Sequence, residues 1–259
     1  MGRAEGGRDP GRWVLPLVLA LAGGLWAAAA VERWWPACRP GERGSLACTL
    51  IQDHRFDYVA PSAPWVPVGS AAQYAGAGYL ALAVAFAVMA AGRPRPVGLP
   101  LGSVLALVTA VVGMVTVASG VLERPVAPAI GVVAMAVWGL AGPLLILGLC
   151  ALRVRPRRGP DPAWFTTAFL VLATPIPGFL FTPTFGHGSY DTASWDGMLG
   201  AIMLVLAGGA ALASACLPDV RSPAGEGDGE DGVAGGGGEL DVAAVRLGNR
   251  VDDRQAQPG

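Results

Sequence analysis

Six long apolar stretches of this sequence contain no charged residue. The core of a bilayer is about 30 Å thick, so a helix needs roughly 20 apolar residues to cross it once. The stretches are residues 13–31, 71–91, 99–122, 130–152, 163–181 and 197–217, and each is long enough for one crossing. None shows the polar face that recurs every 3.6 residues in a helix at the surface of a soluble protein. The sequence therefore predicts an all-α integral membrane protein, built as a bundle of six transmembrane helices.

The arginine residues predict the direction of these helices, because positive charge is held on the cytoplasmic side of a membrane. They cluster before the first stretch, in the second and fourth connections and after the sixth stretch: Arg3, Arg8, Arg12, Arg93, Arg95, Arg153, Arg155, Arg157, Arg158, Arg221, Arg246, Arg250 and Arg254. The third connection contains only Arg124, and the fifth contains none. The first connection is an exception, since it contains arginines beside acidic residues. The majority of connections predict that both termini are cytoplasmic.

The predicted organisation has three parts. Residues 1–12 form a cytoplasmic N-terminus, and residues 13–217 form the membrane domain, with a long outer loop at 32–70. Residues 218–259 form a cytoplasmic tail, which is rich in glycine and acidic residues and includes an unbroken glycine run at 235–238. Such a composition predicts disorder. The alanines at 28–30 also resemble the cleavage site of a secretory signal, and cleavage there would leave five spans.

Composition suggests the source and the partners of the chain. All 18 basic residues are arginine, and the chain contains 38 glycines and 22 prolines, a bias that indicates a GC-rich bacterial genome. We therefore expect a multi-pass protein of the bacterial plasma membrane. The net charge of −1 gives no electrostatic support for a nucleic-acid partner. The expected partners are the lipid bilayer and another membrane protein, and no cofactor is predicted.

The four cysteines divide between the two predicted sides of the membrane. Cys38 and Cys48 lie in the outer loop, whereas Cys150 and Cys216 lie at cytoplasmic ends of spans. Disulfides form in oxidising compartments and are rare in the cytoplasm. The sequence therefore predicts a Cys38–Cys48 disulfide that staples the outer loop. A redox-active pair is the alternative, although the Cys-x-x-Cys spacing of such pairs is absent.

The two histidines of the chain are both predicted to lie outside the membrane, near carboxylates. Candidate ligand-binding residues are His54, Asp53 and Asp57 in the first connection, with His187 and Asp191 in the fifth. Imidazole and carboxylate groups suit a zinc site or acid–base chemistry. Their spacing matches no motif of known mechanism, so the alternative is that they are ordinary polar residues of solvated loops.

The predicted spans contain no Asp, Glu, Lys, Arg or His, which disfavours an ion-coupled pump. Their polar residues are expected to bond to neighbouring backbone or helices: Gln73, Tyr74, Ser103, Thr109, Thr116, Ser119, Thr166, Thr167, Thr174 and Ser214. The fifth stretch contains Pro175, Pro177 and Gly178, which predict a kinked or broken helix. A broken helix can line a binding site or can simply bend near its end.

The function that these features favour is non-catalytic: a membrane scaffold, a partner subunit or a sensor. One alternative is a permease for a small solute or lipid that uses the broken fifth helix. The other is an enzyme or metal-binding protein that acts at the outer face through His54 and His187.

Overall fold

The computed structural model describes residues 13–39, 45–93, 95–152, 162–177, 195 and 197–216. The chain divides into two units, Met1–Pro218 and Asp219–Gly259, and every described residue belongs to the first. The N-terminus and the tail that were predicted to be cytoplasmic lie outside the described residues. Helices are the regular secondary structure of the described part, which contains no strand. The predicted all-α membrane class is confirmed.

Among the described residues, five helices are long and apolar enough to cross a membrane. They are α1 (Val14–Trp34), α3 (Ala71–Ala91), α4 (Arg95–Leu122), α5 (Pro128–Ala151) and α8 (Met198–Cys216), and α6 (Pro162–Leu172) is a shorter apolar helix. Two short helices, α2 (Leu46–Leu50) and the 3-10 helix η2 (His54–Phe56), lie between α1 and α3.

The prediction of six full spans is wrong by one within the described residues, because α6 has 11 residues. This helix ends at Leu172, and Ala173 and Thr174 are not helical. The residue before a proline is disfavoured in the helical region, and Thr174 directly precedes Pro175. One further helical turn covers residues 175–177. Gly178 lies outside the described residues.

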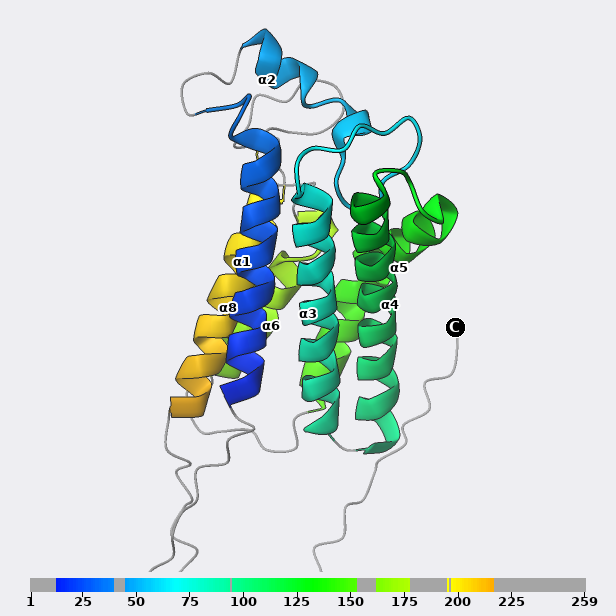
Figure 1. Ribbon diagram of the computed structural model, residues 1–259. Helices are drawn as coiled ribbons and strands as arrows, with labels where there is room; N and C mark the ends of the chain where they lie inside the picture. The colour runs from blue at the N-terminus through cyan, green and yellow to red at the C-terminus, as the bar shows by residue number, and fades with distance from the viewer. Residues whose placement is uncertain are drawn as a thin grey trace, which may run out of the picture. The chain divides into compact units, whose positions relative to one another are not determined.

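The long helices and α6 form a closed ring. Each packs mainly against two others, in the order α1, α3, α4, α5, α6, α8 and back to α1 (Figure 1). Helices that are neighbours in the chain are thus neighbours in the ring, and α8 closes it against α1. Large buried side chains fill the interior, among them Trp26, Leu82, Phe86, Trp138 and Leu204.

Glycines allow the backbones of adjacent helices to approach closely, as expected where small residues line membrane helix contacts. A Cβ atom added at Gly76 of α3 would lie 2.7 Å from the carbonyl oxygen of Gly113 in α4. One added at Gly23 of α1 would lie 2.8 Å from the carbonyl oxygen of Ala201 in α8. The closest contacts therefore depend on positions that have no side chain.

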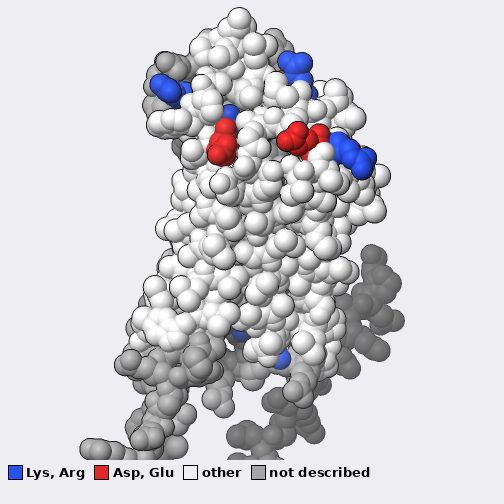
Figure 2. Space-filling view, in the orientation of Figure 1, with Lys and Arg blue, Asp and Glu red and all other residues white. Residues whose placement is uncertain are grey.

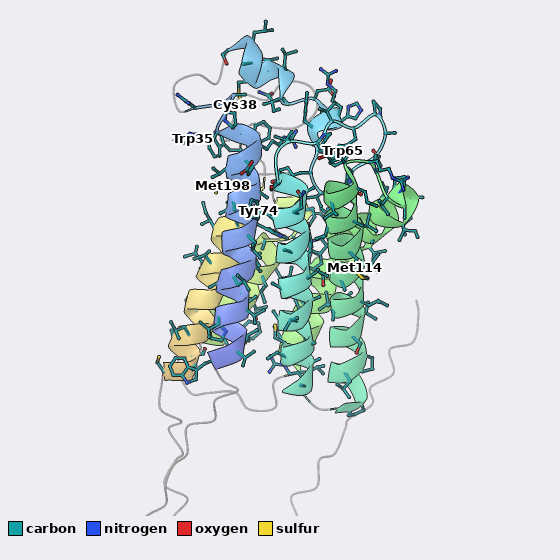
Figure 3. All side chains as sticks on the ribbon, viewed as in Figure 1. Trp35, Cys38, Trp65, Tyr74, Met114 and Met198 are labelled. Carbon is teal, nitrogen blue, oxygen red and sulfur yellow. A yellow bond between two sulfur atoms is a disulfide. The ribbon has the colours of Figure 1, made fainter. Side chains whose placement is uncertain are left out.

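Charged side chains gather at the ends of the helices, and an uncharged band lies between them on the face shown in Figure 2. Most of the visible charge lies at the end where α1 leads into α3. We call the described part of residues 35–70 at this end the cap (Figure 3). The uncharged band is the surface that a lipid bilayer environment requires.

Candidate functional site

The cap is anchored to the bundle by a buried arginine. Arg33, in the last turn of α1, is only 3% exposed. Its Nη1 lies 2.7 Å from Asp57 Oδ1, and its Nη2 donates to the carbonyl oxygen of Ile51 at 3.1 Å. Its guanidinium also lies 4.4 Å from the ring centroid of Trp34. The side chain of Arg33 therefore ties both short helical segments of the cap to the end of α1.

The predicted disulfide between Cys38 and Cys48 is confirmed, with an S–S distance of 2.05 Å. Both cysteines are completely buried and pack with Ala30 and Trp34 at the end of α1. Cys48 is held in α2, whose N-cap residue Ser45 accepts a hydrogen bond from the Cys48 amide at 3.1 Å. The staple thus fastens α2 to the chain that leaves α1.

Further hydrogen bonds join the cap to other helices of the ring. The amide of Ala60 donates to Thr116 Oγ1 of α4 at 3.0 Å, and the indole of Trp195, near the start of α8, donates to the carbonyl oxygen of Cys38 at 3.0 Å. Within the cap, the indole of Trp65 donates to the carbonyl oxygen of Asp57 at 2.7 Å. The cap is therefore a fixed part of the bundle end.

The predicted histidine cluster is only partly described. The side chain of His54 is 56% exposed, and its Nδ1 lies 3.5 Å from Asp53 Oδ1. Asp53 also caps η2, where its side chain accepts from the Arg55 amide at 2.9 Å, and Asp57 binds Arg33. His187 and Asp191 lie outside the described residues. The described residues contain no group of three or more potential metal ligands.

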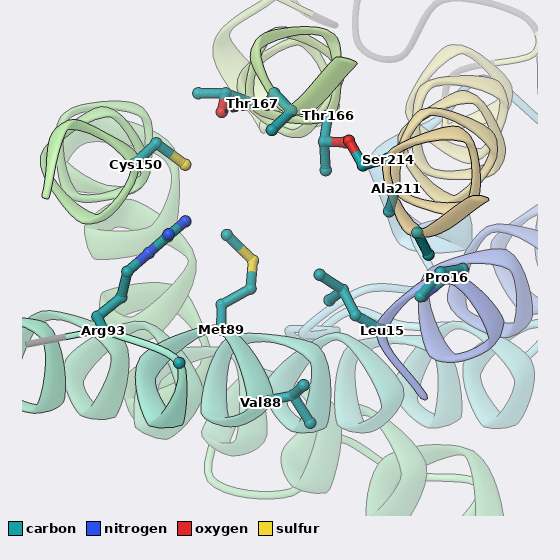
Figure 4. Close-up of a pocket in the computed structure, with 13 residues that line it drawn as sticks. Leu15, Pro16, Val88, Met89, Arg93, Cys150, Thr166, Thr167, Ala211 and Ser214 are labelled. Carbon is teal, nitrogen blue, oxygen red and sulfur yellow. Dashed lines mark hydrogen bonds between the residues drawn. The ribbon is translucent and has the colours of Figure 1, made fainter. Parts of the chain in front are cut away.

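A second candidate site is a cavity of about 280 Å³ inside the ring, at the end opposite the cap. Figure 4 shows that helices α1, α3, α5, α6 and α8 surround it. Its apolar walls include Leu15, Met89 and Ala211, and its polar or charged walls include Arg93, Cys150, Thr166, Thr167 and Ser214. Leu15, Met89 and Cys150 lie near the ends of α1, α3 and α5 that are opposite the cap, so the cavity lies at that end of the bundle.

Two hydroxyl groups of the cavity have no hydrogen-bond partner among the described residues. Thr166 Oγ1 and Ser214 Oγ are both buried, and their side chains lie on the side of the cavity formed by α6 and α8 (Figure 4). The neighbouring Thr167 differs, because its Oγ1 donates to the carbonyl oxygen of Ala163 at 2.9 Å. Arg93, just beyond the end of α3, projects into the cavity from the opposite wall.

The sequence did not predict this cavity, although it identified several of its residues. The expectation that polar side chains bond to nearby backbone is confirmed for Thr109, Ser119, Thr167 and Thr174, which bond to carbonyl groups of the preceding turn. It is wrong for Thr166 and Ser214 within the described residues. The feature of the sequence that could have indicated the cavity is the presence of polar residues next to the arginine-rich ends of the helices.

Comparisons of the chain with protein families, with curated proteins and with solved structures give no match.

Proposed function

We propose that this protein is a non-catalytic partner subunit of a bacterial plasma membrane, and that it binds another membrane protein through its cap. In this proposal the cap lies outside the cell and both termini lie in the cytoplasm. Scaffold and sensor roles are variants of the same proposal, because each requires a fixed surface that a second protein recognises.

The positions of the cysteines support this orientation. The Cys38–Cys48 disulfide lies in the cap, and disulfides persist in oxidising spaces such as the bacterial periplasm. The free cysteines, Cys150 and Cys216, lie at the other end of the bundle, together with Arg93. Arginine at that end agrees with the retention of positive charge on the cytoplasmic side.

The observation that carries the proposal is an exposed apolar pair on a firmly held helix. Leu46 is 75% exposed and Leu50 is 51% exposed, and both belong to α2. Residues four apart lie on the same face of a helix, so the two leucines form one patch. In Figure 1, α2 is the part of the cap farthest from the long helices. The patch therefore lies away from the uncharged band of the long helices, and a rigid apolar surface there suits a protein partner.

Co-purification from the native membrane tests this function. A double variant, Leu46→Asp with Leu50→Asp, places two negative charges on the patch. Wild-type protein purified in mild detergent should retain a membrane protein partner in stoichiometric amount, and the double variant should lose it. The matched control is Ser62→Asp with Ala63→Asp, since these cap residues are also exposed but lie outside α2. Identical partner profiles for wild type and the α2 variant would contradict the proposal.

A second candidate is a permease for a small solute or lipid. The observation that favours it is the cavity, because three of its wall residues, Ala163, Thr166 and Thr167, belong to α6. This helix is interrupted before Pro175, and interrupted helices commonly line the substrate sites of transporters. Transport of a solute into vesicles that contain the purified protein would support this candidate over the first.

A further inference from the structure

We propose that the cavity opposite the cap binds the anionic group, a phosphate or carboxylate, of a small amphiphile. Arg93 supplies the positive charge, and the hydroxyls of Thr166 and Ser214 donate hydrogen bonds to the anion. This site is independent of the proposed docking function of the cap, since the two lie at opposite ends of the bundle.

The unsatisfied hydroxyl of Thr166 is the first reason. Thr166 is only 6% exposed, lines the cavity, and its Oγ1 has no hydrogen-bond partner among the described residues. A buried hydroxyl without a partner costs free energy, so natural proteins rarely retain one. Helix α6 satisfies the hydroxyl of Thr167 internally but leaves that of Thr166 without a partner among the described residues. An acceptor that enters the cavity would satisfy the hydroxyls of both Thr166 and Ser214.

The charge of the cavity wall identifies the acceptor as an anion. Arg93 is the charged residue of the described lining, which contains no acidic residue. Figure 4 shows the Arg93 side chain directed inward, with Thr166 and Ser214 on the other side. A guanidinium group matches the geometry of carboxylate and phosphate oxygens, and charge-assisted hydrogen bonds are stronger than neutral ones. Donors on both sides of a cavity whose described lining has no acidic residue favour an anion as its occupant.

The apolar part of the wall indicates that the ligand is amphiphilic. Leu15, Met89 and Ala211 line the cavity beside the polar groups. A volume of about 280 Å³ is below the usual range for a drug-sized ligand. It accommodates a headgroup and the first carbons of a chain, so longer chains must extend beyond it. Basic pockets between membrane helices on the cytoplasmic side are known to bind anionic lipid headgroups.

Lipid titration of the full-length protein tests the proposal. Purified protein in neutral detergent is titrated with phosphatidylglycerol or with phosphatidylcholine of equal chain length, and bound lipid is counted by native mass spectrometry. We expect one phosphatidylglycerol molecule to bind at least about tenfold more tightly than phosphatidylcholine. The variant Arg93→Gln should lose about tenfold or more in affinity, and Thr166→Val about fivefold.

Matched controls separate the site from general effects. Thr167→Val removes a hydroxyl that is already satisfied in the same cavity, and Arg124→Gln removes an exposed arginine at the cap end. Both should bind phosphatidylglycerol as wild type does. If Thr166→Val does not accumulate, Ser214→Ala is compared with Ser103→Ala instead. Equal affinity for the two lipids, or equal losses in site and control variants, would overturn the proposal.

Inorganic phosphate distinguishes the two sources of the anion. Displacement of phosphatidylglycerol by millimolar phosphate would support a site for free anions, and retention of the lipid would support a lipid-headgroup site. Absence of binding by both phosphatidylglycerol and phosphate would also overturn the proposal.

Discussion

Arg33 has its guanidinium group in an almost completely buried position. A buried charge is tolerated when it is paired and its hydrogen bonds are satisfied. Asp57, the carbonyl oxygen of Ile51 and the ring of Trp34 provide that environment. The pairing partner is 24 positions away in the chain, so the ion pair depends on the whole cap being folded.

Removing the carboxylate of Asp57 should therefore destabilise the cap. We expect Asp57→Asn to lower the free energy of unfolding by about 2 kcal/mol, because Arg33 stays buried while it loses its counter-charge. Thermal melting in detergent measures the loss. Glu123→Gln, which removes an exposed charge at the same end of the bundle, should melt as wild type does. Equal melting temperatures for the two variants would show that the ion pair is dispensable.

The disulfide should contribute a second, separable part of the stability of the cap. Replacing both Cys38 and Cys48 with serine should lower the free energy of unfolding by about 2–3 kcal/mol, because the bridge restricts a short loop in the unfolded chain. Chemical unfolding under oxidising conditions measures this difference. Cys216→Ser is the control, since that thiol is free and exposed. A double variant as stable as the control would contradict the prediction.

At the scale of single helices, the contact between α3 and α4 depends on glycine. We expect Gly76→Ala to destabilise the bundle by about 1–3 kcal/mol, because the added Cβ would meet backbone atoms of Val117 and Gly113 that cannot rotate away. The control is Gly24→Ala, since a Cβ there has open space around it and alanine has the higher helix propensity. Denaturant titration in detergent compares the two. A Gly76→Ala protein as stable as Gly24→Ala would exclude this close contact.

The charge-free stretches predicted the positions of the helices well, and α3 was predicted at both ends. Their limits were less accurate where charge was taken as the end of a helix. Helix α1 continues through Arg33, which pairs with Asp57, and α4 begins at Arg95 rather than residue 99. Proline is tolerated in the first turn of a helix, which explains how α4 includes Pro96. The predicted length of α6 was too great, because the helix ends at Leu172, before Pro175 and Pro177, and does not continue through them.

The candidate sites were less predictable than the helices. The disulfide could be predicted because only compartment and spacing determine it. The cavity could not, because Arg93, Thr166 and Ser214 come from helices far apart in the chain, and only the ring brings them together. Sequence alone also could not separate Thr166 from Thr167, since their difference lies in whether a backbone carbonyl is within reach.

At the scale of the whole membrane domain, the proposed orientation makes a direct prediction. In a background of Cys150→Ala and Cys216→Ser, a membrane-impermeant maleimide added to intact cells should label Ser62→Cys in the cap. It should not label Ser222→Cys until the membrane is permeabilised. The reason is that the proposed orientation, in which arginine is held on the cytoplasmic side, puts the cap outside and the end with Arg93 inside. Labelling of Ser222→Cys but not Ser62→Cys from outside would reverse the orientation.

The closed ring also affects how the protein is made. Helix α1 is synthesised before the other helices of the ring, and its partner α8 is synthesised after them. At roughly 5–20 residues per second, the interval between them is on the order of ten seconds. During this time the face of α1 that includes Gly23, which later meets Ala201, must be covered by lipid or by the insertion machinery. Ring closure therefore follows the synthesis of all the other helices of the ring, and a chain interrupted before α8 would leave this seam without its partner helix.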